Sequence, residues 1–341
     1  MKSNYSNKVL KFINEKYKDI VCVDDFISIS VGGSVARGHA VEESDIDLIC
    51  ISKKVLQYKK IFKKINNMRF EIHVIPIDYI NILLPKISNY ILFINNISDT
   101  TTDVVSMGAK KCNIITKMDD EFTRLLSAWR ELKKIVDSII LYEDNSKYLT
   151  KLKKQFEEIK ISRNIFLLFE KNMDNYSNID LFINLLKLYS LLQHNVFSKV
   201  LWTDIYIEKE YNKQIKRMID EIFNNIYIDT ERFLLWKDIN FNYLLDVHSN
   251  INCDFCKEDY LQCNIMRCII DYINDIERAR KYNMKYGEIL SIKKCSEYIE
   301  ALLKKVNVED NELTNIIKKF EIDREKTLKI YCFIKKENCK N

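Results

Sequence analysis

The sequence is short of the residues that interrupt regular structure, with five glycines and two prolines in 341 residues. Only Gly287 lies beyond residue 150, and both prolines, Pro76 and Pro85, lie before it. Apolar residues recur at helical spacing through much of this later part. We therefore expect the chain after residue 150 to be mostly helical, as a bundle or an irregular array of helices.

Long apolar runs are also missing, since none approaches the roughly 18 residues that a membrane-spanning helix needs. The first residues lack the apolar core and the small-residue cleavage site of a secretion signal. We therefore expect a cytoplasmic protein with no membrane partner. The ten cysteines then indicate reduced thiols rather than a disulfide framework.

The sequence has no strong excess of either charge, with 54 basic and 49 acidic residues and a net charge of +5. This balance does not by itself indicate a nucleic-acid-binding protein. The densest basic stretch, residues 53–64, is expected to form a helix with solvated lysines, and a nucleic-acid contact is its alternative.

Three of the five glycines (Gly32, Gly33 and Gly38) fall within one stretch, VGGSVARGHAVEESDIDL at 31–48. Glycines concentrated in this way predict a backbone that approaches something closely. Asp45 and Asp47 follow in an apolar run with the character of a β-strand, where a spacing of two puts both carboxylates on one face. Two close carboxylates repel unless a cation holds them, and hard oxygen ligands suit Mg²⁺. A glycine turn for phosphates beside a metal-binding pair predicts nucleotide chemistry.

The combination of GGSVARG at 32–38 and SDIDL at 44–48 resembles the signature of the nucleotidyltransferase superfamily that includes DNA polymerase β. It is similar to that of the aminoglycoside adenylyltransferases and the minimal nucleotidyltransferases, over about residues 20–150. The resemblance implies an α+β fold. A nucleotidyltransferase-type α/β catalytic domain with a short mixed sheet would span residues 1–150, and a mostly α-helical acceptor-binding domain would span 151–341.

Helix and strand patterns alternate in the first 150 residues, which favours an α/β domain with a mixed sheet. The helical patterns there lie at 5–18 and 121–137, and the strand patterns at 26–31, 45–52, 68–77 and 137–144. Later helical patterns lie at 151–170, 178–201, 206–224, 259–283, 289–306 and 309–336. We expect the two domains to pack together over a cleft.

The residues after the glycine pair are candidates for holding phosphate. The Ser34 hydroxyl and nearby backbone N–H groups can grip a triphosphate at the start of a helix, although Ser34 can also be a simple N-cap. Arg37 can fork onto a β- or γ-phosphate, or form an ion pair with Glu42 or Glu43. Ser44 either caps the turn or contacts phosphate. The candidate nucleotide-binding residues are Gly32, Gly33, Ser34, Arg37 and Ser44.

A third acid, Glu71, lies inside the apolar strand pattern RFEIHV, where an unpaired carboxylate would be costly. It is a candidate metal ligand, a general base on the acceptor hydroxyl, or both. The resemblance adds that aminoglycoside adenylyltransferases have a similar strand, although Asp is the more usual acid of the superfamily there. The candidate catalytic and metal-binding residues are Asp45, Asp47 and Glu71. His73 shares a strand face with Glu71 and is interpreted as structural, with a place in the site as its alternative.

Two further groups of residues keep a structural and a functional interpretation. The aromatic and acidic residues Trp202, Asp204, Tyr206, Glu208 and Trp236 are interpreted as helix contacts, with an acceptor-binding wall as the alternative. Cysteines lie at 253, 256, 263 and 268, but the last two fall in a helical pattern and the spacing fits no common zinc site. Whether these four cysteines bind zinc stays open.

The predicted activity is transfer of a nucleoside monophosphate, AMP from ATP or another NTP, to an acceptor hydroxyl with release of pyrophosphate. Two Mg²⁺ ions are expected to assist. The leading acceptor is a small molecule such as an aminoglycoside-like antibiotic, as in antibiotic resistance, although a slightly basic protein does not advertise the acidic cleft that a polycation needs. The alternatives are nucleotidylation of a protein or tRNA, synthesis of an oligonucleotide or cyclic nucleotide, and binding without catalysis. The base preference, the acceptor and the oligomeric state stay open.

Overall fold

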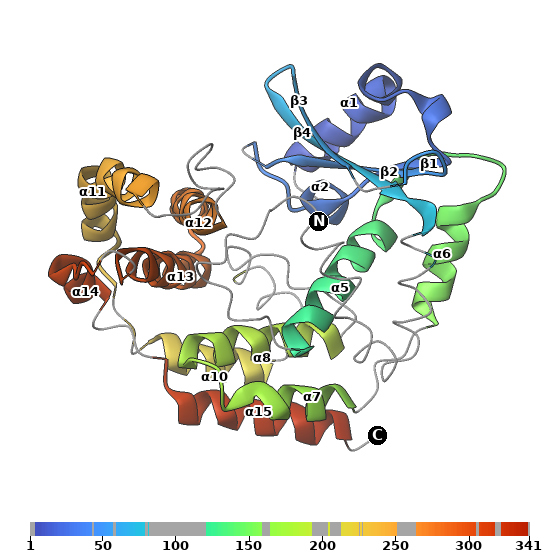
Figure 1. Cartoon of the computed structure of the whole chain (residues 1–341). Helices are drawn as coiled ribbons and strands as arrows, with labels where there is room; N and C mark the ends of the chain where they lie inside the picture. Colours follow the sequence, from blue (N-terminus) through green and yellow to red (C-terminus); the bar gives the residue numbers. More distant parts are fainter. Residues whose placement is uncertain are drawn as a thin grey trace. The chain divides into compact units, whose positions relative to one another are not determined.

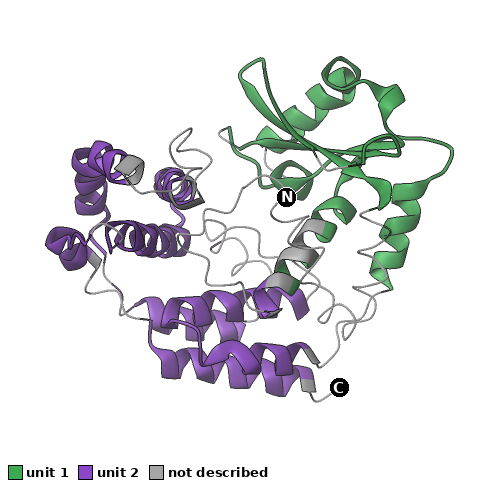
Figure 2. Cartoon of the chain, in the orientation of Figure 1, with its two compact units in different colours: residues 1–108, 124–162 green, residues 109–123, 163–341 purple. Residues whose placement is uncertain are grey.

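The chain is seen here as a computed structural model in which two compact units are described separately (Figures 1 and 2). The first unit comprises residues 1–108 and 124–162, and the second comprises residues 109–123 and 163–341. The residues described are 4–42, 44–56, 59–78, 81, 121–158, 164–192, 204, 213–224, 226, 228–250, 264–304, 307–317 and 322–339. The predicted domain boundary at residue 150 stays a prediction.

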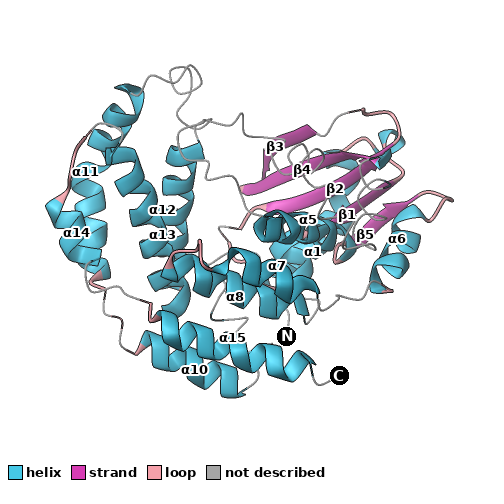
Figure 3. Cartoon of the chain, turned by 60° about the horizontal axis from the view of Figure 1, so that its bottom comes forward, coloured by secondary structure: helices cyan, strands magenta, loops and turns pink. Residues whose placement is uncertain are grey.

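The first unit contains a five-stranded mixed sheet in the order β3-β4-β2-β1-β5. Its strands are β1 (Ser28–Val31), β2 (Ile46–Ser52), β3 (Lys59–Ile65), β4 (Met68–Pro76) and β5 (Ile139–Glu143). Strands β2 and β4 pair in parallel, and the other neighbours pair antiparallel. All described strands lie in this unit, and the described elements of the second unit are helices (Figure 3). The predicted fold class, a short mixed sheet followed by a helical part, is confirmed.

The two faces of the sheet differ in character because side chains alternate along each strand. On one face, Leu48 of β2 and Ile72 of β4 form a buried core with Val9 of helix α1 (Asn4–Ile20). On the opposite face of the same strands lie Asp47 and Glu71, which are register partners. The apolar face therefore fixes the register that brings the two acids together.

The prediction of a helix at 53–64 is wrong, because this part of the chain contains strand β3. It forms a hairpin with β4, in which Ile61 is the register partner of Ile72. The two strands are joined by Asn66 and Asn67, whose φ angles of 49° and 62° lie in the left-handed region. Asparagine tolerates this conformation, and an Asn pair suits the two-residue turn whose twist matches paired strands. The Asn-Asn pair was the available sequence signal, and pairing with β4 overrides the lysine-rich local pattern.

A short loop carries the glycines from β1 to β2. After β1 comes the five-residue helix α2 (Gly33–Arg37), which ends at Gly38 with a φ of +78°. The loop that follows is attached to α1, because the Ala40 backbone N–H donates to the buried Ser6 hydroxyl at 3.1 Å. A 3₁₀ helix, η1 (Val23–Asp25), connects α1 to β1.

Two further helices complete the described part of the first unit. Helix α5 (Glu121–Val136), which belongs to this unit from Arg124 onward, leads into β5, and α6 (Tyr148–Glu157) follows β5. The buried Trp129 ring of α5 lies 4.8 Å, centroid to centroid, from Phe156 of α6. These helices match the helical patterns predicted at 121–137 and at the start of 151–170, which contains two helices rather than one.

The second unit has a buried apolar core between four of its helices, with Trp236, Leu244, Ile269, Ile299 and Leu313 among its members. The described helices are α7 (Asn164–Met173), α8 (Asn178–Leu192), α10 (Lys213–Phe223), α11 (Thr230–Asn250), α12 (Asn264–Lys281), α13 (Lys285–Lys304), α14 (Asn311–Ile317) and α15 (Arg324–Cys339). In the described residues, no helix is both long and apolar enough to cross a membrane.

Helix α11 was not among the predicted helical segments. Its apolar residues do not keep to one face, because Leu235 and Ile239 are exposed whereas Phe233 and Leu244 are buried. A pattern without a single apolar stripe gives little helical periodicity, so only the contacts of the folded unit identify this helix.

We expect Ser6→Ala to loosen the loop between the glycines and β2. The substitution leaves the Ala40 N–H without its hydroxyl partner in a buried position, which typically costs about 1–3 kcal/mol. Native-state hydrogen exchange of the Ala40 amide should become about 5- to 100-fold faster. The exposed neighbour Asn7→Ala is the control and should leave this amide protected. Unchanged exchange in Ser6→Ala would contradict the assigned role of the hydroxyl.

Candidate functional site

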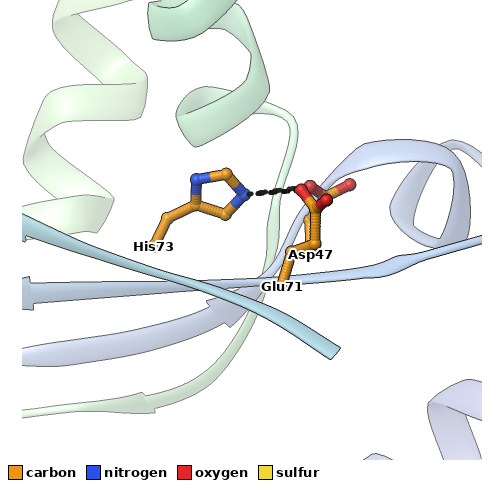
Figure 4. Close-up of side chains that lie close together, drawn as sticks. All are labelled: Asp47, Glu71 and His73. Carbon is orange, nitrogen blue, oxygen red and sulfur yellow. Dashed lines mark hydrogen bonds and ion pairs between the residues drawn. The ribbon is translucent and has the colours of Figure 1, made fainter. Parts of the chain in front are cut away.

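Three side chains from two parallel strands meet on the face of the sheet opposite to the α1 core (Figure 4). Asp47 of β2 lies opposite Glu71 of β4, and His73 follows Glu71 by two residues on the same face. One ligand atom from each lies within 4.8 Å of the others. The structure therefore brings together Asp47 and Glu71, two of the three acids named from the sequence. It also adds His73, which supports the alternative interpretation of this residue as part of the site.

The Asp47 carboxylate is surrounded by positive and hydrogen-bonding groups. The Lys134 ammonium of α5 lies 2.6 Å from Asp47 Oδ1, and His73 Nε2 lies 3.1 Å from the same oxygen. Lys134 Nζ also lies 3.2 Å from His73 Nε2. Burial alone would raise the pKa of Asp47, but Lys134 and His73 outweigh it and hold that pKa well below its ordinary value. Asp47 is therefore an anion at neutral pH.

Lys134 is a member of the site that sequence reasoning missed. It lies in the last turn of a helix whose lysines look like an ordinary solvated face. No local motif surrounds it, and only the packing of α5 in the first unit brings its ammonium to Asp47. The only hint in the sequence was Asp47 itself, because a carboxylate in an apolar strand needs a positively charged partner.

Glu71 is also paired. Lys60 of β3 lies 2.7 Å from Glu71 Oε2, and His73 Nε2 lies 3.7 Å from the same oxygen. The Glu71 side chain is about 20% exposed. The ion pair offsets the cost of a carboxylate inside an apolar strand while leaving one side of it accessible.

The glycine turn makes its close approach to Asp47 itself. Gly33 has a φ of +63°, and a Cβ atom built on it would lie 1.7 Å from Asp47 Oδ2. Any side chain at this position would displace the carboxylate, so glycine is required here for two independent reasons. The neighbouring Gly32 donates its N–H to the Asp47 backbone carbonyl at 2.9 Å. A Cβ on Gly32 would lie 2.6 Å from Ile49 Cδ1.

Ser34, Arg37 and Ser44, the other candidate phosphate contacts, have different surroundings. Gly32 rather than Ser34 is the N-cap of α2, so Ser34 lies inside the first turn. The Nε atom of Arg37 is buried and has no hydrogen-bond partner in the described part of the chain, where Arg37 also forms no ion pair with Glu42. Ser44 accepts a hydrogen bond from the Val41 N–H at 3.0 Å, which is the turn-capping role.

Asp45 lies just before β2 and does not join the three clustered residues. Its Oδ1 atom is 3.0 Å from Arg69 Nε, and its side chain is partly exposed. The expectation that Asp45 ligates a metal stays a prediction. A metal bound by Asp45 would have to replace its ion pair with Arg69.

The clustered donors fit a divalent cation. Asp47 and Glu71 offer carboxylate oxygens, which suit Mg²⁺ and Mn²⁺, and His73 offers an imidazole nitrogen, which suits metals further along the transition series. The Lys134 ammonium already lies against Asp47, so positive charge is favoured at this position. The donor set is thus compatible with the metal predicted from the sequence, without specifying which metal it is.

The residues of the second unit that the sequence had singled out have structural roles where they are described. Asp204 accepts hydrogen bonds from the backbone N–H groups of Tyr286 and Gly287, at 3.0 and 2.8 Å, and so caps the start of α13. Trp236 is buried, and its indole N–H donates to Asp310 at 2.9 Å. Cys268 is partly buried on α12. The residues outside the described ranges are Trp202, Tyr206, Glu208, Cys253, Cys256 and Cys263.

Comparison with known families identifies the first unit. Residues 7–100 match the family model of the nucleotidyltransferase domain. This match confirms the resemblance carried by the glycine turn and by Asp45 and Asp47, and the first unit has the nucleotidyltransferase fold. Nucleotidyltransferases generally use an NTP and a divalent metal, and the Asp47 cluster lies inside the matched residues.

The other comparisons add little. No curated protein matches the chain. A solved structure of a nucleotidyltransferase-like protein from Exiguobacterium sibiricum 255-15 shares 10% identity and covers 96% of this chain and 91% of its own, with a TM-score of 0.28. A TM-score this low supports no argument about fold or function.

We expect Gly33→Ala to destabilise the first unit by about 2–4 kcal/mol, because the new Cβ collides with the Asp47 carboxylate and the left-handed backbone is strained. The free energy of opening of β2, measured by hydrogen exchange in increasing urea, reports the effect. Part of it should disappear when Asp47→Ala removes the carboxylate, giving a coupling of about 1 kcal/mol or more. Fully additive effects would show that the two residues do not collide.

The depressed pKa of Asp47 predicts a pH-dependent contribution to stability in metal-free protein. Its folded pKa lies below the ordinary 3.8, so the contribution is present above that pH and is lost as the pH falls further. Near neutral pH, Asp47→Asn should lower the unfolding free energy of the first unit by about 1–3 kcal/mol. In EDTA, this difference should shrink by about 1.4 kcal/mol per pH unit in acid. A difference that does not change with pH would contradict the assigned electrostatics.

Proposed function

We propose that the first unit transfers a nucleoside monophosphate, AMP from ATP, to a hydroxyl of an acceptor and releases pyrophosphate. The observation that carries the proposal is the contact of the Gly32–Gly33 turn with an ionised Asp47 that also faces Glu71 and His73. A turn that brings backbone N–H groups beside a metal-compatible pair of acids suits a triphosphate and its cation. The match to the nucleotidyltransferase domain supports the general reaction.

In this proposal, the glycine turn and the side chains of Arg37 and Lys134 bind the triphosphate. We assign the triphosphate to the turn, with Ser34, Arg37 and the turn-capping Ser44 as its further contacts. The buried Arg37 Nε, which has no hydrogen-bond partner among the described residues, supports this role. The Lys134 backbone carbonyl lies 3.4 Å from the position of a Cβ on Gly32, so the residue borders the same turn. Its ammonium can therefore offset charge on the phosphate oxygens as well as on Asp47.

The chemical step is an in-line displacement at the α-phosphorus. The acceptor oxygen forms the new bond to phosphorus, the bond from phosphorus to the bridging oxygen breaks, and pyrophosphate leaves. We assign the hydroxyl proton to Glu71, whose partly exposed carboxylate lies 2.7 Å from the Lys60 ammonium. Asp47 and Glu71 would hold Mg²⁺, with Asp45 as the further ligand proposed from the sequence. When bound, Mg²⁺ would neutralise the triphosphate and orient the reacting oxygens.

The acceptor is the finer part of the proposal. A small hydroxyl-bearing molecule such as an aminoglycoside, with a role in antibiotic resistance, was the leading prediction from the sequence. The edge of the site formed by β3 is rich in lysine, which disfavours a polycationic acceptor. That observation favours the second candidate, in which the acceptor is an anion such as a nucleic acid. Nucleotidylation of a protein and synthesis of oligonucleotides from NTPs alone are the remaining outcomes.

To test the proposal, the protein is incubated with Mg²⁺ and one NTP labelled at its α-phosphate. Separate reactions contain no acceptor, an aminoglycoside panel, tRNA or cell lysate. Label should move to one class of acceptor, or into a product made from NTP alone. Asp47→Asn and Glu71→Gln should each lower transfer about 100-fold or more, because they remove a charged ligand and, for Glu71, the proton acceptor. Asp45→Asn tests the third acid.

The matched control is Asp246→Asn, which changes an exposed carboxylate on α11 and should leave transfer unchanged. Transfer that survives Asp47→Asn, or the absence of transfer with every NTP and acceptor, would refute the proposed function. Omitting Mg²⁺ and adding EDTA should have the same effect as Asp47→Asn in the intact protein.

A further inference from the structure

Strand β3 adds a row of side chains to the face of the sheet that carries the site. Because paired strands share a face at each register position, Phe62 lies on the side of its partner Glu71. By the same register, Lys60 lies on the side of His73 and Lys64 on the side of Arg69. Lys60, Phe62, Lys64 and Arg69, named here the β3 edge, therefore line one border of the catalytic cluster.

Phe62 is the unusual member of the β3 edge, because its large apolar side chain is 67% exposed. The Lys60 ammonium lies 4.9 Å from the centre of the Phe62 ring and 2.7 Å from Glu71. The ring is thus linked through one lysine to the acid assigned to the acceptor hydroxyl. Register places Phe62, Glu71 and Asp47 on three neighbouring strands, so the first and last lie about 10 Å apart along the backbone pairing direction.

Positive charge accompanies the ring. Lys64 is exposed, and it forms no ion pair within the described part of the chain. Arg69 is about 54% exposed and contacts Asp45. The alternate lysines of β3 belong to the other face, where Lys63 donates to the Ile20 carbonyl at 2.7 Å. The cations of the β3 edge are therefore directed to the same face as the catalytic cluster.

Protection of an edge strand explains part of this arrangement. Lysines on a strand with one unpaired side discourage another chain from adding to the sheet. An exposed phenylalanine has the opposite effect, because it makes the edge more adhesive. The combination of an open ring with flanking cations instead matches a ligand that has flat bases and phosphates, since aromatic rings stack on bases and lysines contact the backbone.

We propose that the β3 edge binds a single-stranded nucleic acid as the acceptor, with a base stacked on Phe62 and phosphates held by Lys64 and Arg69. The term acceptor rests on the proposed function, whereas the binding itself does not. A strand bound here directs its terminal hydroxyl toward Glu71, over a distance of one or two nucleotides. That oxygen then forms the bond to the α-phosphorus, pyrophosphate leaves, and Glu71 takes the proton.

Binding of a short fluorescent single-stranded RNA to the full chain, followed by anisotropy without NTP or Mg²⁺, tests the proposal. Phe62→Leu keeps an apolar side chain but removes the ring, and should weaken binding about 5- to 100-fold. Phe62→Tyr keeps the ring and should bind like the wild type. Lys64→Gln should reduce the slope of log affinity against log salt by about 0.7. Leu167→Ala and Lys329→Gln, both exposed on the second unit, are the matched controls and should change neither quantity.

Titrations with ATP and with a polyaspartate peptide test whether the β3 edge binds other anionic ligands instead. Equal weakening of ATP binding by Phe62→Leu would assign the ring to the nucleotide substrate and overturn the proposal. Binding of a polyaspartate peptide as tight as that of RNA would reduce the edge to a general anion site and overturn it as well. Wild-type RNA affinity in Phe62→Leu would do the same.

The binding assay tests the β3 edge and the transfer assay tests the proposed function, so each proposal can be refuted without the other. RNA binding that depends on Phe62, in a protein that transfers no nucleotide, would support the β3 edge as a binding site and refute the proposed function. Transfer to an acceptor that is not a nucleic acid, at a rate unaffected by Phe62→Leu, would uphold the proposed function and overturn the inference. Asp47→Asn should abolish transfer while leaving RNA binding intact, since Asp47 is not part of the β3 edge.

Discussion

The Asp47 carboxylate is the group around which the first unit is arranged. Gly33 leaves room for it, Lys134 neutralises it, and His73 contacts the same oxygen. A carboxylate this buried would be costly without these partners, and each partner comes from a different part of the chain. The ion pair therefore links the glycine turn, two parallel strands and helix α5 in one electrostatic unit, and it leaves Asp47 ionised where a cation can replace or join Lys134.

Charge is distributed unevenly around this centre. The glycine turn and Lys134 lie on one side of the acids, whereas the β3 edge lies on the other, with Lys60 joining Glu71 to the exposed Phe62 ring. In the proposed reaction, the triphosphate and the anionic acceptor each meet positive charge beside the acids. The acids themselves would repel both ligands, so a divalent cation between them has a clear electrostatic purpose.

Local patterns predicted most of the described elements of the first unit, because four of its strands are short apolar runs and its glycines are concentrated in one turn. The prediction failed at 53–64, where a lysine-rich pattern concealed β3 and the Asn66-Asn67 turn. Pairing with β4 supplies hydrogen bonds and a buried neighbour for Ile61 that no local window contains. Helix α11 was missed for a related reason, because its buried face is defined by neighbouring helices rather than by a continuous apolar stripe.

The sequence by itself determined the class of the first unit, since GGSVARG at 32–38 and SDIDL at 44–48 resemble the nucleotidyltransferase signature and lie close together in the chain. It also identified Glu71, because a carboxylate in an apolar strand needs a reason to be there. Only the tertiary structure decided which groups meet. Parallel pairing of β2 with β4 brings His73 to Asp47, α5 supplies Lys134, and Arg69 pairs with Asp45. These contacts join residues distant in sequence, and their partners are selected by packing and register, which no local pattern encodes.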